Sequence, residues 1–335
     1  MKVLGRDYTR EELLRRSNPS AIYGTRRLEL SDGRGRGQRI IEVKTSAGLR
    51  ASLSVDRCLD ILDLEYKGIN ISFLSKNGVV SAALTSPDTD SFPNYWPGGF
   101  LYTCGLRNTG PSCNINGEFF PTHGRIGVTP AESVSVSTNE DLITISGKVR
   151  ETALFGPNLE MERKISLPSD GAKITVKDII SNLTPEAENV LFLYHINFGF
   201  PFLSEDIELE FPESDIRGRT DLAQKNMENR LKITPPIDGE PELVFFYQPK
   251  EKDVNVSLSN RRLGIKAVLS YDSLKLPVLS QWKCMRSGDY ALGIEPGTSF
   301  LRGRKEELKN GYDIRLPGFG HLEYGFTITL NDANS

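Results

Sequence analysis

The sequence predicts an all-β protein, a large antiparallel β-sandwich with a short helix near its N-terminus. Many short segments alternate apolar and polar residues, a period typical of strands with one buried face. Gly, Pro, Asn and Asp separate these segments, as turns require. After residue 20 no long apolar stripe has the 3.6-residue helical period, which argues against alternating strands and helices.

The N-terminal segment predicts the helix. Thr9 and Glu12 form the S/T-x-x-E capping-box pattern, and Asn18-Pro19 predicts where the helix ends. Beyond it we find no Ser- or Gly-rich linker and no internal repeat. We therefore predict a helical lead-in over residues 1–22 and a single β-sandwich domain over residues 23–335.

Four segments show the strand alternation most clearly. Their apolar positions are Val134 and Val136; Leu159, Met161, Ile165 and Leu167; Ile207, Leu209 and Phe211; and Val254, Val256 and Leu258. The sequence Pro168-Ser169-Asp170-Gly171 predicts a hairpin turn. The continuous apolar runs VLFLYHINFGF and ELVFFYQ predict strands buried on both faces. The all-β interpretation is weakest at residues 220–232, because this segment could instead form a helix inside a long insertion.

Composition excludes several classes of partner. The net charge is −3, from 41 basic and 44 acidic residues without a long basic block, which argues against nucleic acid and anionic membranes as partners. No stretch has the roughly 20 apolar residues that span a bilayer. The charged start lacks a signal-peptide core, and the four cysteines lack CxxC spacing, so we expect a reduced, cytoplasmic protein. Exposed strand edges could pair across a homodimer.

Common cofactor and nucleophile motifs are missing. The sequence SDGRGRG lacks the strand and helix that flank a dinucleotide-binding loop. Cys104, Cys113 and His123 lack the spacing of a zinc site, and no G-x-S-x-G elbow occurs. We expect neither a metal nor an organic cofactor.

Three ionisable residues in strand-like contexts are the candidate chemistry: His123, His195 and Glu295. Histidine and glutamate are the usual groups that move protons near neutral pH. Ala291 and Gly293 share the face of Glu295, which leaves room there for a ligand or for a closely packed strand. A solvent-exposed strand end is the structural alternative for this glutamate.

His195 shares a strand face with Asn197, and both precede a turn, where polar residues often form a pocket rim. The alternatives are a core histidine for His195 and an ordinary loop residue for His123. Arg57 and Arg107 could bind hydroxyls or an anion, or form surface ion pairs. Trp282 and the sequence FPNYWPGGF could stack on a sugar or simply pack.

In six short motifs the chain resembles the aldose 1-epimerase (galactose mutarotase-like) superfamily, and within it the DUF4432-type branch. They are, in order, GRGQRIIEVKTSAGL, VDRCLDI, PGGFLYTCGL, THGRIGVTPA, HINFGFP and GIEPGTSFLRGR. The resemblance runs from about Gly24 to the end. It implies a β-supersandwich fold and a carbohydrate-binding, catalytic domain.

The resemblance also implies roles. His195 matches the general acid for the sugar ring oxygen, and Glu295 matches the general base for the anomeric hydroxyl. His123 matches a histidine that binds the sugar near its ring oxygen, and Arg107 matches a substrate-binding arginine. The chain has CGLRNTGPS where common mutarotases carry GR…NRI, and Arg57 belongs to this branch's own pattern. We also expect burial to raise the pKa of Glu295 and the nearby carboxylate to raise that of His195.

These observations favour an isomerase that interconverts the anomers of a monosaccharide or its derivative by ring opening and closure. A carbohydrate-binding protein without activity on the same fold is one alternative. An epimerase or isomerase for a keto sugar or sugar phosphate is another, and it would need cations near the pocket. The candidates for those cations are Arg57, Arg107, Arg125, Arg302 and Arg304.

Overall fold

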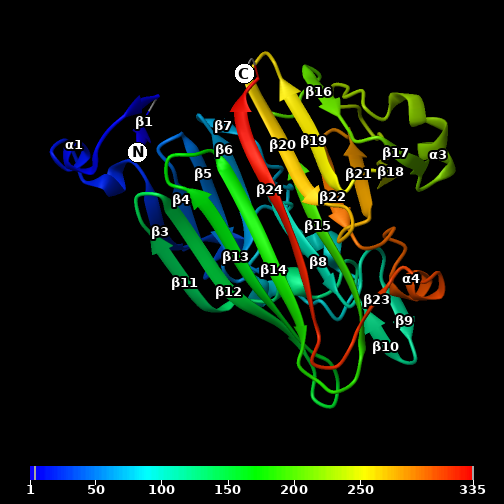
Figure 1. Cartoon of the computed structure of the whole chain (residues 1–335). Coiled ribbons are helices and arrows are strands. Elements are labelled where there is room, and N and C mark those ends of the chain that lie inside the picture. The colour runs from blue at the N-terminus through cyan, green and yellow to red at the C-terminus, as the bar shows by residue number, and fades with distance from the viewer. Residues whose placement is uncertain (4, 334–335) are drawn as a thin grey trace.

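The computed structural model describes residues 1–3 and 5–333, which fold mainly into antiparallel sheets (Figure 1). The predicted all-β class is therefore confirmed. Across the front of Figure 1 lies the longest sheet, in which β24 joins two groups of strands from different parts of the chain. Its strands, in spatial order, are β11 (Glu132–Thr138), β12 (Leu142–Thr152), β13 (Asn158–Pro168), β14 (Lys173–Asn182), β24 (His321–Asp332), β20 (Ile265–Asp272), β19 (Asp253–Asn260) and β16 (Ile207–Glu210).

A second sheet packs against the first and carries the candidate residues. Its strands, in spatial order, are β17 (Ser214–Gly218), β18 (Leu243–Pro249), β21 (Val278–Cys284), β22 (Ala291–Gly297), β15 (Glu188–Phe198) and β23 (Ile314–Leu316), and β8 (Leu101–Leu106) also pairs with β15. The two apolar runs of the sequence form β15 and β18. Both are buried over most of their length, as predicted.

The remaining strands form one five-stranded sheet and two small hairpins. The sheet contains β3 (Gly24–Glu29), β4 (Arg39–Lys44), β5 (Leu49–Ser54), β6 (Asp60–Tyr66) and β7 (Ile69–Asn70). The hairpins are β1 (Lys2–Val3) with β2 (Arg6–Asp7), and β9 (Cys113–Ile115) with β10 (Glu118–Phe120). The α-helices are α1 (Arg10–Leu14), α2 (Phe92–Tyr95), α3 (Asp221–Lys225) and α4 (Arg304–Lys309). Short 3₁₀ helices occupy Pro19–Ala21, Gly33–Gly35, Ala82–Leu84, Ile126–Val128 and Met227–Asn229.

The main core lies between the sheets, and the second sheet separates it from a smaller apolar cluster. On β15 the side chains of Phe192, Tyr194 and Ile196 enter the main core, because alternate residues of a strand point to one face. Leu193 joins the smaller cluster on the opposite face. His195 is two residues from Leu193 on the same strand, so both side chains lie on the same face and His195 is directed away from the main core.

Local predictions met different outcomes. Thr9 caps α1 with Glu12 in a capping box, as expected. The helix ends at Leu14, earlier than predicted, and Asn18 instead caps a separate 3₁₀ turn. The predicted hairpin turn joins β13 to β14, where the Gly171 N–H donates to the Pro168 carbonyl. Residues 220–232 do contain the short helix α3, capped by Thr220.

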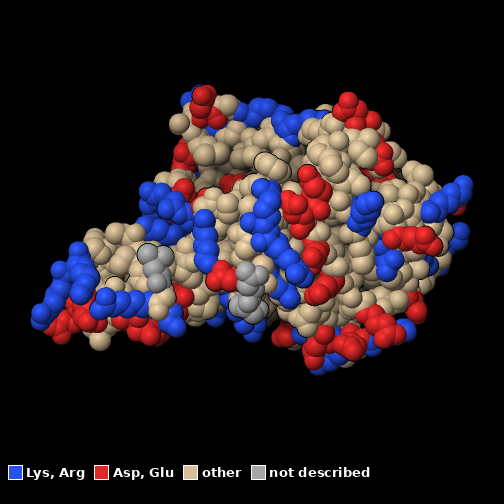
Figure 2. All heavy atoms as spheres, turned by 90° about the horizontal axis from the view of Figure 1, so that it is seen from above, with Lys and Arg blue, Asp and Glu red and all other residues tan. Residues whose placement is uncertain are grey.

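Charges of both signs are mixed on the surface. On the face seen in Figure 2, basic and acidic side chains lie beside one another. None of the helices in the described ranges is long and apolar enough to cross a bilayer. Within residues 1–3 and 5–333 we also find no cluster of three His, Cys, Asp or Glu side chains that could hold a metal ion.

Candidate active site

The pairing of β15 with β22 brings His195 and Glu295 together. Ile196 is the register partner of Ile294, and Asn197 is that of Gly293, so His195 lies opposite Glu295 on neighbouring strands. The His195 Nε2 atom is 3.3 Å from the Glu295 Oε1 atom. The two side chains are only 8% and 1% exposed, so this is a buried acid–base pair.

Gly293 makes room for the Glu295 carboxyl. A Cβ atom at this glycine would lie 2.4 Å from Glu295 Oε1 and 3.1 Å from the Cβ of Trp282. The free space that the sequence indicated beside Glu295 is therefore filled by its own carboxyl, folded back along the strand. This conformation holds Oε1 next to the imidazole of His195.

His123 approaches the pair from the loop after β10. Its backbone is left-handed, with φ of 60°, and is held by hydrogen bonds from its N–H to the Gly110 carbonyl and from the Gly105 N–H to its carbonyl. The Gly110 N–H also donates to His123 Nδ1 at 3.4 Å, which leaves the proton of the neutral ring on Nε2. The ring centroids of His123 and His195 are 5.7 Å apart.

A cavity of about 950 Å³ opens over these three residues. Trp96 and Trp282 line it, with ring centroids 5.3 Å and 5.6 Å from that of His195. Phe92 also lines it, 5.2 Å from His123. The volume lies in the upper range for small-molecule sites, and the aromatic walls suit the apolar face of a sugar ring.

Burial makes both histidines weak bases and the glutamate a weak acid. It lowers the pKa of His195 to about 3, with a smaller contribution from His123. It lowers the pKa of His123 to about 4, assisted by the Arg219 guanidinium. It raises the pKa of Glu295 well above the usual range, although Arg219 opposes that shift. Burial therefore favours a protonated carboxyl beside a neutral imidazole in the unliganded pair.

The sequence-based expectation for Glu295 agrees with this direction, whereas that for His195 is wrong. A nearby carboxylate was expected to raise the pKa of His195. Burial of the imidazole has the larger effect on its pKa, and burial of the carboxyl favours the neutral form, which does not stabilise an imidazolium. Glu295 Oε1 is buried without a hydrogen bond among the described residues, and its contact with His195 Nε2 is 3.3 Å long.

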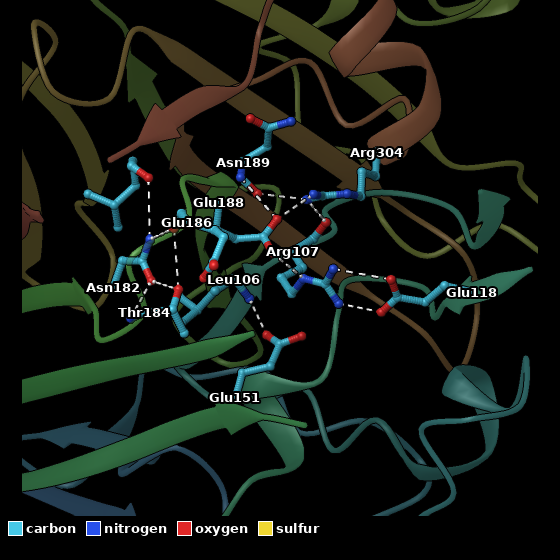
Figure 3. Close-up of polar contacts among 11 residues, drawn as sticks. Leu106, Arg107, Glu118, Glu151, Asn182, Thr184, Glu186, Glu188, Asn189 and Arg304 are labelled. Atoms are coloured by element: carbon cyan, nitrogen blue, oxygen red, sulfur yellow. Dashed lines mark hydrogen bonds and ion pairs between the residues drawn. The ribbon is translucent and has the colours of Figure 1, made fainter. Parts of the chain in front are cut away.

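Arg107 and Arg57 do not reach the cavity. The Arg107 guanidinium pairs with Glu118 and, at 3.2 Å, with Glu188, in a network that also holds Arg304 (Figure 3). Arg57 is 2% exposed and donates to the backbone carbonyls of Val80 and Tyr95. Both arginines were predicted to bind substrate. They instead connect chain segments near the site by hydrogen bonds and ion pairs, because a buried guanidinium needs hydrogen-bond acceptors for its N–H groups.

Asn197 also lies outside the cavity lining, beneath His195. Its side-chain amide donates to the Gly99 and His195 carbonyls, at 3.0 Å and 3.1 Å. The Oδ1 atom of Asn197 and the Nδ1 atom of His195 are both buried without a hydrogen bond among the described residues. This placement suits a residue that positions His195 better than one that contacts substrate. Trp282, by contrast, lines the cavity.

The sequence reasoning missed Arg219 and Glu242, which line the cavity as an ion pair 2.5 Å apart. Trp282 Nε1 also donates to Glu242 Oε2, at 2.7 Å. Each residue stands just outside a strand, Arg219 after β17 and Glu242 before β18. A charged residue at a strand end is too common to be a signal by itself.

Solved structures resemble this fold. A provisionally named aldose 1-epimerase from Klebsiella pneumoniae is 25% identical, with a TM-score of 0.87 over 93% of this chain and 84% of that one. A galactose mutarotase-like protein from Clostridium acetobutylicum has 15% identity and a TM-score of 0.68, over 93% and 99%. A galactose 1-epimerase from Lactobacillus acidophilus has 10% identity and a TM-score of 0.61, over 92% and 99%. The last two establish likeness of fold alone.

No curated protein matches the sequence. Residues 35–330 match the family described as Domain of unknown function (DUF4432), which covers most of the chain. The chain therefore belongs to the DUF4432 family and has a galactose mutarotase-like fold.

Proposed function

We propose that this protein is an aldose 1-epimerase that interconverts the α and β anomers of a monosaccharide or its derivative. The observation that carries the proposal is the buried contact between His195 and Glu295 at one wall of an aromatic cavity. Anomerisation needs one proton donor and one proton acceptor near the O–C1–O unit of the sugar, and this pair supplies both.

Ring opening begins when the shared proton moves from Glu295 to His195, which gives a carboxylate and an imidazolium. The carboxylate removes the proton from the C1 hydroxyl. The imidazolium donates its proton to the ring oxygen as the C1–O bond to the ring breaks and the C1 carbonyl forms. Rotation about C1–C2 and closure with the roles reversed yield the other anomer, with no net gain or loss of protons or electrons.

His123 acts as a neutral donor in this scheme. Because Nδ1 accepts from the Gly110 N–H, its Nε2–H is available to a sugar oxygen. The residue binds the sugar near its ring oxygen and stays uncharged at neutral pH. Trp96 and Trp282 hold the ring by stacking.

The test is anomer exchange measured by NMR on the variants Glu295→Gln and His195→Asn. Each is expected to reduce the exchange rate by about 100- to 10,000-fold, since each removes one positioned acid–base group. Circular dichroism verifies the fold. Retained sugar binding with no exchange in the wild-type protein would instead favour the carbohydrate-binding alternative.

A further inference from the structure

Only one of the five arginines that stand near the site motifs is free to bind a ligand in the cavity. Arg57, Arg107 and Arg304 are committed to carbonyl or carboxylate acceptors, the last two in the network of Figure 3. Arg125 pairs with Asp88. Arg302 lines the cavity and has no ion pair or side-chain hydrogen bond within residues 1–3 and 5–333.

Two aromatic rings hold the Arg302 guanidinium in place. It lies 5.0 Å from the ring centroid of Phe300 and 5.7 Å from that of Tyr312. Its backbone N–H is fixed by Glu307 Oε1 at 2.8 Å. A stacked guanidinium keeps all five N–H donors available in its plane, and these match the oxygens of a carboxylate or phosphate. The Arg302 guanidinium is thus placed so that its donors could meet an anion in the cavity.

Arg302 lies on the same side of the cavity as His123. The His123 N–H donates to the Gly110 carbonyl, and Gly110 packs so closely on Leu301 that an added Cβ would be 2.3 Å from the Leu301 carbonyl oxygen. Arg302 follows directly in the chain. A sugar whose ring oxygen faces His123 would therefore direct the neighbouring exocyclic carbon toward Arg302.

The charges around the cavity favour an anion. Besides the buried Glu295, the lining holds four cationic side chains and three acidic ones. The cations are Lys76, Arg219, Arg286 and Arg302, and the anions are Glu240, Glu242 and Asp289. Lys76 pairs with Asp289 and Arg219 with Glu242, whereas Arg286 and Arg302 have no ion pair among the described residues. Of these two, Arg302 is the one whose guanidinium lies beside two aromatic rings.

We infer that the substrate is a monosaccharide with an anionic group, phosphate or carboxylate, on the exocyclic carbon next to the ring oxygen, and that Arg302 binds this group. The orientation of the sugar rests on the proposed function. The binding of an anion by Arg302 does not. A charge-assisted hydrogen bond of this kind is expected to favour the charged sugar by about 10- to 100-fold over its neutral parent.

The experiment compares glucose and galactose with their 6-phosphates and with glucuronate and galacturonate. Calorimetry gives Kd and NMR gives kcat/KM for anomer exchange, for the wild type and for Arg302→Gln, Arg302→Lys and Arg36→Gln. Arg36 is an exposed arginine outside the cavity lining, so its variant has the same change in charge. We expect Arg302→Gln to reduce the preference for charged sugars at least tenfold, Arg302→Lys to restore part of it, and Arg36→Gln to leave it unchanged.

The outcomes separate this inference from the proposed function. Charged sugars that bind through Arg302 but do not exchange would support the inference and end the proposed function. Exchange at equal kcat/KM for charged and neutral sugars would do the reverse. The inference is also overturned if no charged sugar binds more tightly than its parent, or if Arg36→Gln reduces the preference as much as Arg302→Gln does.

Discussion

Replacing Gly293 by alanine should displace the Glu295 carboxyl without removing any reacting group. The new Cβ would lie 2.4 Å from Glu295 Oε1, so the carboxyl must retreat by about 1 Å to reach ordinary van der Waals contact. The backbone of Gly293 is not left-handed, so alanine itself is tolerated. Because Oε1 is the far end of a flexible side chain, the strain is relieved by moving the carboxyl.

A misplacement of about 1 Å in a reacting group costs about 100-fold in rate, or about 3 kcal/mol in the activation barrier. The cost in stability should be smaller, about 1–2 kcal/mol, as for a modestly overpacked core. We therefore expect Gly293→Ala to reduce kcat for anomer exchange about 100-fold, measured by NMR, with urea denaturation as the check on stability.

Gly297→Ala is the matched control on the same strand and face. Its Cβ would lie 2.7 Å from Leu193 Cδ1 and 3.1 Å from the Phe192 carbonyl oxygen, which is comparable crowding away from the carboxyl. It should lose similar stability and keep its activity. The reasoning is refuted if Gly293→Ala exchanges anomers at the wild-type rate, or if both variants lose activity equally.

Four further predictions concern burial and the contacts of single side chains. Since burial lowers the pKa of His195 to about 3, the acid limb of kcat/KM should fall below about pH 5, and a limb near the usual value of about 6.5 would contradict this. Below about pH 6.5 the buried neutral ring of His195 also binds fewer protons than the same residue does in the unfolded chain. Acidification toward pH 4 should therefore lower the melting temperature less in His195→Asn than in the wild type, and equal losses in the two proteins would contradict this. Asn197→Ala should lower kcat about tenfold at unchanged KM and move the His195 Nδ1 NMR shift, whereas an unmoved shift would leave only a structural role. Arg163→Met should lower the free energy of unfolding, measured by urea denaturation, by about 3–5 kcal/mol. The substitution leaves the side chains of Asp60 and Asp178 buried without the guanidinium that contacts them at 2.5 Å and 2.7 Å. A loss below about 1 kcal/mol would refute this.

Local pattern was enough to predict the all-β class. The alternating positions Leu159, Met161, Ile165 and Leu167 are fully buried, because a side-chain period of two places them on one face whatever the strand's partners are. The capping box at Thr9 likewise depends only on residues within one turn. The helix end was misjudged, since Asn18-Pro19 is equally suited to begin a new turn.

The three ionisable residues stood out in the sequence because a charge is costly in apolar surroundings. Their meeting was decided by tertiary structure. The register of β15 on β22 sets His195 opposite Glu295, and the backbone of Gly110 holds His123 nearby. No local pattern encodes a register between strands separated by about a hundred residues.

The roles of the arginines and the protonation of the pair also depended on the fold. The sequence did not distinguish Arg107, which is committed to two glutamates, from Arg302, whose guanidinium lies beside Phe300 and Tyr312 and has no ion pair among the described residues. It did predict that burial raises the pKa of Glu295, but it did not predict that burial lowers the pKa of His195. The sequence alone determined which side chains are able to move protons and which strand faces are apolar, because these follow from residue type and period. Partners, burial and protonation state were decided only by tertiary structure, because they depend on which distant segments exclude water from each group.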